Sequence, residues 1–260
     1  MKLSIVVPVY NEKKYLPEML KRLFKVLVGI PRELIIVDDG STDGTREWVV
    51  ENFGTSPSRW TGIAERDGVP TPIIRAADDL DPEQSGILVR PLYLERNQGK
   101  GAALRNGIRA ATGNVIVVQD ADIEYDPQDL ARMWDLIADG HADVVYGSRF
   151  FGRPHRCLYY HHYLANKAIS VLFSILYNQI LSDLEVCYKM FTREVAEILT
   201  LRCNDFGFEI EFSSNVARAR TLRIFELGIS YYGRTYAEGK KIGWRDGLKA
   251  IWYIVRFRFA

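Results

Sequence analysis

The sequence predicts a layered α/β fold, in which a mostly parallel sheet is flanked by helices. Short β-branched runs such as KLSIVVPV (residues 2–9) and NVIVVQD (residues 114–120) are typical of strands that are covered on both faces. Helical stretches alternate with these runs, as they do around a parallel sheet. A chain of 260 residues, 47% of them apolar, can bury one sizeable core or two small ones.

The order of the elements follows from these patterns. Strands are expected at residues 2–9, 33–39, 87–95, 114–120, 142–148 and 223–232. Helices are expected after a cap at Asn11, from the turn GSTDG to about residue 52, at 99–111, after Asp126-Pro127, at about 158–181, 192–201 and 207–220, and at 244–259. Asp126-Pro127 is a typical helix start, because it combines a capping side chain with proline in the first turn.

Residues 55–86 interrupt the alternation of strands and helices. The segment is rich in Pro, Gly, Ser and Asp and shows no clear period, so we expect an insertion loop at the surface and not a domain. The sequence thus predicts one α/β domain over residues 1–243 and a C-terminal amphipathic helix, rich in aromatic and basic residues, over residues 244–260.

The stretch VVQDADIEYDP (residues 117–127) places acidic side chains directly after a strand that is expected to be buried. Ligands of open parallel sheets bind at the carboxyl ends of the strands. Asp120 and Asp122 bring two carboxylates close together, and a proton or a cation must relieve their repulsion. A Mg²⁺ or Mn²⁺ site fits these ligands, and a solvated acidic loop is the alternative.

Two further strand ends carry polar chemistry. In DDGSTDGT (residues 38–45), Asp39 can accept hydrogen bonds from a base or a ribose, although simple turn chemistry also accounts for the segment. NQGKGAAL (residues 97–104) puts glycines and Lys100 at a helix start, which suits an anion or close packing on the sheet. No GxGxxG follows the first strand, which disfavours a Rossmann oxidoreductase.

Charge and cysteine content bear on partners and location. Residues 1–140 carry 17 basic and 22 acidic side chains, whereas residues 141–260 carry 17 and 11. The uneven distribution of charge has two explanations. It arises by chance, or the acidic half holds a cation and the basic half contacts an anion. The three cysteines lack metal-ligand spacing and are expected to be reduced in a cytosolic protein, and the histidines suggest no zinc site. The N-terminus does not resemble a signal peptide, and the apolar run 168–181 is too short to span a bilayer.

Six ordered motifs together resemble family 2 glycosyltransferases, within them the dolichyl-phosphate mannose synthase and dolichyl-phosphate glucosyltransferase branch. They are VVPVYNE, VDDGSTDGT, RNQGKGAALRNGI, QDADIEYDP, ADVVYGSR and RTYAEGKK, and the match covers roughly residues 1–53 and 87–242. The resemblance implies a GT-A (Rossmann-like) catalytic domain. It also implies inverting transfer of a hexose, mannose or glucose, from a GDP- or UDP-sugar to dolichyl or another polyprenyl phosphate.

The resemblance implies roles for individual residues on the donor side. The family's nucleoside contacts fall on Pro8, Tyr10, Glu12, Val37 and Asp39. Its DxD motif falls on Asp120, Ala121 and Asp122, whose carboxylates meet the metal and the donor diphosphate. Glu124 replaces a Gln that ligates the metal in some members, so it is a third candidate ligand. Arg234 and Lys240 match basic residues of the loop over the donor diphosphate.

The acceptor side is where the chain departs from the family. Arg149 falls where the family meets phosphate, but Tyr163 stands in place of an Arg that helps some mannose synthases to bind the acceptor phosphate. We therefore expect Arg149, His162 and Lys167 to hold the acceptor phosphate, with an open question about the acceptor's identity.

The nucleophile decides whether the reaction needs a base. A phosphate oxyanion is already deprotonated, so positioning by Arg149 suffices. A hydroxyl acceptor needs a carboxylate base, for which Asp183 is the candidate unless it caps a helix or pairs with Lys189. The candidate catalytic residues are thus Asp122, Arg149 and Asp183.

The function follows as a hypothesis with two alternatives. Aromatic and basic residues in 244–260 suit a bilayer interface, although a core-packed helix is also possible. We expect a metal-dependent transferase on the cytosolic membrane face, with no nucleic-acid partner. The alternatives are a transferase for hydroxyl acceptors in polysaccharide or glycolipid synthesis and a non-catalytic nucleotide-binding module.

Overall fold

The computed structural model describes residues 1–66, 68–76, 86–156, 159–235, 238 and 244–259. These residues form one nine-stranded sheet in the order β4-β3-β5-β2-β1-β6-β8-β7-β9. Its strands are β1 (Leu3–Val9), β2 (Arg32–Asp38), β3 (Ser58–Arg66), β4 (Val69–Ala76), β5 (Ile87–Tyr93), β6 (Val115–Val118), β7 (Val144–Ser148), β8 (Lys189–Thr192) and β9 (Ile224–Gly228).

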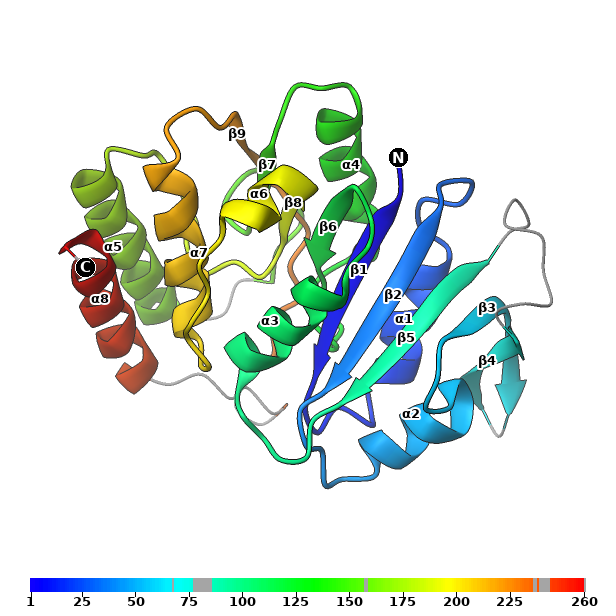
Figure 1. The fold of residues 1–260 in the computed structure, drawn as a ribbon. Coiled ribbons are helices and arrows are strands. Elements are labelled where there is room, and N and C mark those ends of the chain that lie inside the picture. The colour runs from blue at the N-terminus through cyan, green and yellow to red at the C-terminus, as the bar shows by residue number, and fades with distance from the viewer. Residues whose placement is uncertain (67, 77–85, 157–158, 236–237, 239–243, 260) are drawn as a thin grey trace.

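Helices flank this sheet (Figure 1). They are α1 (Leu16–Phe24), α2 (Thr45–Phe53), α3 (Lys100–Ala110), α4 (Leu130–Ala138), α5 (Tyr160–Tyr177), α6 (Arg193–Ile198), α7 (Gly207–Arg218) and α8 (Trp244–Phe259), with a short 3-10 helix, η2 (Pro127–Asp129), before α4. The expected α/β architecture is confirmed.

The centre of the sheet is parallel and buried. Strands β5, β2, β1 and β6 are parallel neighbours, and every side chain of β2 and β6 is buried. Their β-branched residues fill the space between the two helical layers, as expected for strands covered on both faces. Because the four strands run in one direction, their carboxyl ends reach the same edge of the sheet.

Strands β3 (Ser58–Arg66) and β4 (Val69–Ala76) pair antiparallel and extend the sheet at one edge. The sequence pattern indicated no strands in this segment. A register shift between Trp60 and Gly62 breaks the alternation of buried side chains, and Pro70 and Pro72 lie in β4, which pairs with β3 alone. The hairpin is anchored by the buried ring of Trp60, whose centroid lies 4.5 Å from that of Phe24 and 5.9 Å from that of Phe53.

Strand β8 is also absent from the expected elements. It runs antiparallel between β6 and β7, directly before the helix expected from residue 192, which is present as α6. Lys189, its first residue, is fully buried and pairs with the carboxylate of Glu209 in α7. The charge of Lys189 interrupts the apolar pattern of this four-residue strand, so the sequence does not read as a buried strand. The carboxylate that compensates the charge belongs to Glu209, in a helix that is distant in the sequence.

The two predicted helix caps have different outcomes. Asp126 accepts a hydrogen bond from the backbone N–H of Gln128 at 3.0 Å, so its capping role is confirmed. The cap expected at Asn11 is wrong, since α1 begins at Leu16. Asn11 has a φ of 54°, and its side-chain oxygen accepts from Thr42 N–H at 2.8 Å, which ties the loop after β1 to the loop after β2.

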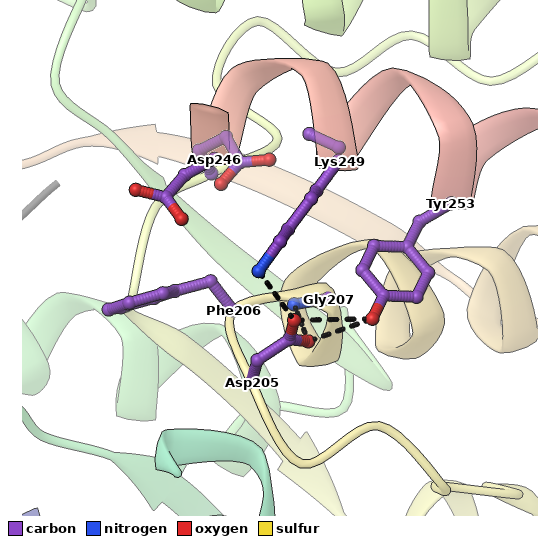
Figure 2. Close-up of a pocket in the computed structure, with 8 residues that line it drawn as sticks. Asp205, Phe206, Gly207, Asp246, Lys249 and Tyr253 are labelled. Atoms are coloured by element: carbon purple, nitrogen blue, oxygen red, sulfur yellow. Dashed lines mark hydrogen bonds and ion pairs between the residues drawn. The ribbon is translucent and has the colours of Figure 1, made fainter. Parts of the chain in front are cut away.

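Helices α5, α7 and α8 pack against one another beside the sheet (Figure 1). Helix α8 docks on the start of α7, where the Tyr253 hydroxyl donates to Asp205 at 3.0 Å and the Lys249 ammonium approaches the same carboxylate at 3.7 Å (Figure 2). In the described part of the chain, no helix combines the length and apolar character needed to cross a membrane.

Candidate active site

The carboxyl ends of the parallel strands open into one cavity of about 1090 Å³. At one end it is lined by loops after β1, β2 and β6 and by the start of α3, and at the other by α5 and α8. Most of the predicted site residues line it: Pro8, Tyr10, Glu12, Asp39, Asp120, Ala121, Asp122, Glu124, Arg149, His162 and Arg234. The fold thus brings the donor-side and acceptor-side predictions into one space.

Three predicted residues lie elsewhere. Val37 is buried in the core of the sheet, and Asp183 is fully buried behind the cavity wall. Lys167 points its ammonium at the carbonyl of Ser182, 3.2 Å away, and is not among the residues that line the cavity. Lys240 lies outside the described residues.

Asp39 organises the loop before α3. Its two carboxylate oxygens accept hydrogen bonds from the backbone N–H groups of Gln98 and Gly99, each at 2.8 Å. Burial raises the pKa of Asp39, and these two bonds oppose the shift. Gly99 has a φ of 100°, and a Cβ there would lie 2.3 Å from the carbonyl oxygen of Asn204, so only glycine fits. The loop delivers Lys100 to the cavity.

The carboxylates of the DxD segment are held by two cations. The Lys100 ammonium lies 2.8 Å from Asp120. The guanidinium of Arg234 lies 2.6 Å from Asp122 and 2.7 Å from Glu124. The third acid, Glu124, also accepts from the Tyr231 hydroxyl at 2.8 Å.

This concentration of negative charge changes the proton affinity of Asp122. Burial and the charges of Asp120 and Glu124 raise the pKa of Asp122 to about 8, against the lowering effect of Arg234. Positive charge at this site is therefore needed to keep Asp122 ionised at neutral pH.

The acidic segment fits a hard divalent cation in its chemistry. Carboxylate oxygens are the ligands that Mg²⁺ and Mn²⁺ take, and the raised pKa of Asp122 indicates negative charge that Arg234 compensates only in part. Within the described residues, however, no cluster of three or more His, Cys, Asp or Glu side chains is already arranged to hold a metal. Instead, Arg234 bridges Asp122 and Glu124, and Lys100 pairs with Asp120.

Arg149, which also lines the cavity, forms a bidentate pair with Asp183. Arg149 Nε donates to Asp183 at 2.7 Å, and its Nη2 donates at 2.6 Å. The guanidinium also lies over the ring of Tyr231, 5.3 Å from its centroid. Asp183 neither caps a helix nor pairs with Lys189; it fixes the plane of Arg149.

Comparison with known proteins decides the family. The model of Glycosyl transferase family 2 matches residues 4–66 and 66–199. This chain belongs to that family. It is a glycosyltransferase, and the predicted GT-A fold is confirmed.

Several relatives and solved structures resemble this glycosyltransferase. It is 28% identical over 223 residues to undecaprenyl-phosphate 4-deoxy-4-formamido-L-arabinose transferase of Pectobacterium atrosepticum, covering 85% of this chain and 58% of the relative. It is 26% identical over 248 residues to dolichol-phosphate mannosyltransferase of Pyrococcus furiosus, covering 93% and 61%. The chain thus spans about three fifths of the length of these relatives.

A solved structure shows the same fold. Glucosyl-3-phosphoglycerate synthase from Mycobacterium tuberculosis, in complex with Mn²⁺, UDP and glucosyl-3-phosphoglycerate, superposes with a TM-score of 0.68 at 17% identity. The alignment covers 99% of this chain and 80% of that protein.

The glycosyltransferase cavity contains residues that the sequence patterns did not single out as site residues. They are the acids Glu185 and Glu209 and the ring of Phe206. Lys100, which the sequence placed at a helix start that suits an anion, lies 3.5 Å from Glu209. Burial and the charge of Glu209 raise the pKa of Glu185 to about 7. Only the position of Glu185, two residues after Asp183, could have drawn attention to it.

Proposed function

We propose that this glycosyltransferase moves a hexose from a nucleotide-sugar to a polyprenyl phosphate, with inversion at the anomeric carbon. The observation that carries the proposal is the cavity, which is lined by the strand ends and the DxD segment and also by residues of α5 and α8. Its first part suits a nucleoside diphosphate, and its second part suits a lipid-linked anion. The names of the two relatives, an undecaprenyl-phosphate transferase and a dolichol-phosphate mannosyltransferase, support this acceptor class.

The donor side provides carboxylates and a mobile positive charge for the diphosphate. When bound to Asp120 and Asp122, with Glu124 as a third ligand, Mg²⁺ or Mn²⁺ would stabilise the negative charge that develops on the leaving nucleoside diphosphate. Arg234 would then leave the carboxylates and donate to the diphosphate. Tyr10 and Asp39 lie at the far end of the cavity, where the nucleoside, UDP or GDP, would sit.

The acceptor side favours a nucleophile that needs no base. Asp183 is fully buried, and both of its oxygens accept from Arg149, so it is poorly placed to take a proton from an acceptor. Arg149 lines the cavity together with His161, His162 and Asn166 of α5. These groups would orient a phosphate oxyanion toward the sugar, and the phosphate would attack without general-base help. Lys167 would contribute only after leaving Ser182.

Helices α5 and α8, which line the cavity, also present an exposed apolar surface that suits a bilayer. Exposed apolar side chains of α5 and α8 form this surface: Tyr160, Tyr163, Leu164, Val171, Ile175, Leu248, Ile251, Trp252, Val255 and Phe259. Arg256 and Arg258 lie among them and are exposed as well. Apolar side chains beside basic ones are typical of helices that lie in a membrane interface. We infer peripheral attachment to the cytosolic face, where polyprenyl phosphate would reach the cavity.

A washed-membrane assay tests the proposal. The protein is incubated with radiolabelled UDP- or GDP-hexoses, Mn²⁺ and polyprenyl phosphate, and the organic-extractable label is counted. We expect label in lipid with the wild type and none with Asp122→Ala. Donor turnover with label only in water-soluble glycans would favour a hydroxyl acceptor, and no turnover of any donor would favour a binding module.

A further inference from the structure

One wall of the cavity is acidic and aromatic, and neither phosphate group of the proposed reaction accounts for it. Glu185, Glu209 and Phe206 line this wall, in the same cavity as the DxD segment and residues of α8. Glu209 is compensated, because its carboxylate lies between the ammonium groups of Lys100 and Lys189. The Oε1 atoms of both acids are buried and accept no hydrogen bond from the residues that the structure describes, but Glu185 also makes no ion pair with them, although the charges of Lys189 and Arg149 act on it.

The charges of the reactants indicate what belongs at this wall. The diphosphate and the acceptor phosphate are anions, and a buried carboxylate would repel either of them. The transferred sugar is neutral and rich in hydroxyl groups, which donate well to an ionised carboxylate. The sugar must also lie between the two phosphates, and Glu185 lines the same cavity as Asp120 and Arg149.

We propose that Glu185 accepts hydrogen bonds from hydroxyl groups of the donor sugar and thereby selects the hexose that is transferred. The inference rests on the proposed nucleotide-sugar donor and adds the residue that recognises its sugar. Phe206, whose residue surface is 37% exposed, would pack its ring against the C–H face of the same sugar. Figure 2 shows the Phe206 side chain directed away from Asp205 and Tyr253, on the side of Asp246.

The energetics of Glu185 support a role in binding. A carboxylate that is removed from water without a full set of donors destabilises the folded protein. The raised pKa of Glu185 is consistent with that penalty. A sugar hydroxyl that donates a hydrogen bond to Oε1 would remove this energetic penalty in the complex. A sugar that presents no donor there would leave the penalty in place, and this difference produces selectivity.

The test measures donor binding, which separates this inference from the transfer reaction. Calorimetry with Mn²⁺ gives the Kd of UDP, GDP and their glucose, mannose and galactose derivatives for the wild type, Glu185→Ala and Glu185→Gln. We expect Glu185→Ala to weaken the best nucleotide-sugar by roughly 10- to 100-fold and to leave the free nucleotide unchanged, as for loss of hydrogen bonds to a charged group. Glu185→Gln should lie between, because its amide oxygen still accepts. Exposed Glu197→Ala is the matched control.

Three results would overturn the inference. They are unchanged binding of the best sugar by Glu185→Ala, an equal loss for sugar and free nucleotide, or a wild type that binds every nucleotide-sugar no differently from the nucleotide. Normal sugar selection but slow transfer by Glu185→Ala would assign the residue to the chemical step instead. Failure of lipid labelling with intact sugar selection would contradict the proposed function and leave this inference standing.

Discussion

Arg149 and Asp183 are joined by two side-chain hydrogen bonds of 2.7 and 2.6 Å, and Asp183 is fully buried while Arg149 reaches the cavity. The geometry of the pair fixes the guanidinium plane, as bidentate arginine–carboxylate pairs do. Asp183 is thus better explained as a residue that positions Arg149 than as a base.

Asp183→Asn tests this relationship. Loss of one partner of a buried ion pair leaves the other uncompensated, and we expect a loss of about 3 kcal/mol in the free energy of unfolding, measured with urea. Donor binding should persist, while the KM for polyprenyl phosphate rises. The exposed pair of Arg223 and Asp143 gives the control, because Asp143→Asn should have a much smaller effect. A KM unchanged in Asp183→Asn would show that Arg149 needs no positioning.

The location of the site could be predicted from the sequence because its signals are local. Asp120 and Asp122 directly follow a β-branched run, and strand direction alone brings them to the ligand edge of a parallel sheet. Their partners could not be predicted in the same way. Lys100 and Arg234 reach the two acids from segments on either side in the sequence, and only the folded chain shows that they hold Asp120 and Asp122.

Arg234 occupies the position of a counter-ion for Asp122 and Glu124, which leads to a prediction about metal affinity. A metal ion that binds in the absence of the nucleotide-sugar must displace the guanidinium of Arg234 from these carboxylates. We expect Arg234→Gln to bind Mn²⁺ at least about 10-fold more tightly than the wild type without nucleotide, since a competing cation is gone. Its transfer rate should fall. Calorimetry measures the affinity, with Arg156→Gln as a control, because Arg156 pairs with Glu238 at the surface. Equal or weaker Mn²⁺ binding by Arg234→Gln would contradict the competition.

Glu33 predicts how stability depends on pH. Burial alone would raise its pKa, but hydrogen bonds from Lys2, Ser4 and Thr112 outweigh burial and lower the pKa to about 2. A carboxylate with a lowered pKa stabilises the folded state above its unfolded pKa of about 4.5, and this contribution is lost as the pH falls toward 2.

Glu33→Gln should therefore lose about 2 kcal/mol of unfolding free energy at pH 7 and much less near pH 3. Urea unfolding at the two pH values measures the difference, with exposed Glu51→Gln as control. A loss that is equal at both pH values would assign the effect to packing and not to charge.

The elements that escaped prediction share a physical cause. The β3–β4 hairpin has prolines and a register shift that obscure a two-residue period, and β8 begins with Lys189, whose charge is compensated by Glu209 in a distant helix. Glu185 could not be predicted as a site residue either, because its importance depends on the lack of a hydrogen-bond donor for Oε1 among the described residues, which only the structure shows. Local patterns thus predicted the scaffold and the acidic strand end, whereas long-range pairing of charges was visible only in the structure.

The packing of α8 on α7 gives a last prediction, from two glycines on either side of the contact. A Cβ at Gly207 would lie 2.4 Å from the Tyr253 ring, whereas a Cβ at Gly247 would meet nothing within 4 Å (Figure 2). Gly247→Ala should raise stability by about 1 kcal/mol, the usual gain for alanine over glycine in a helix. Gly207→Ala makes the same exchange in α7 but should lower the Tm, because α8 must shift and the Tyr253–Asp205 bond is strained. Differential scanning calorimetry measures both variants, and vesicle sedimentation should show weaker membrane binding for Gly207→Ala alone. If Gly207→Ala matched Gly247→Ala in both measurements, α8 would not depend on this contact.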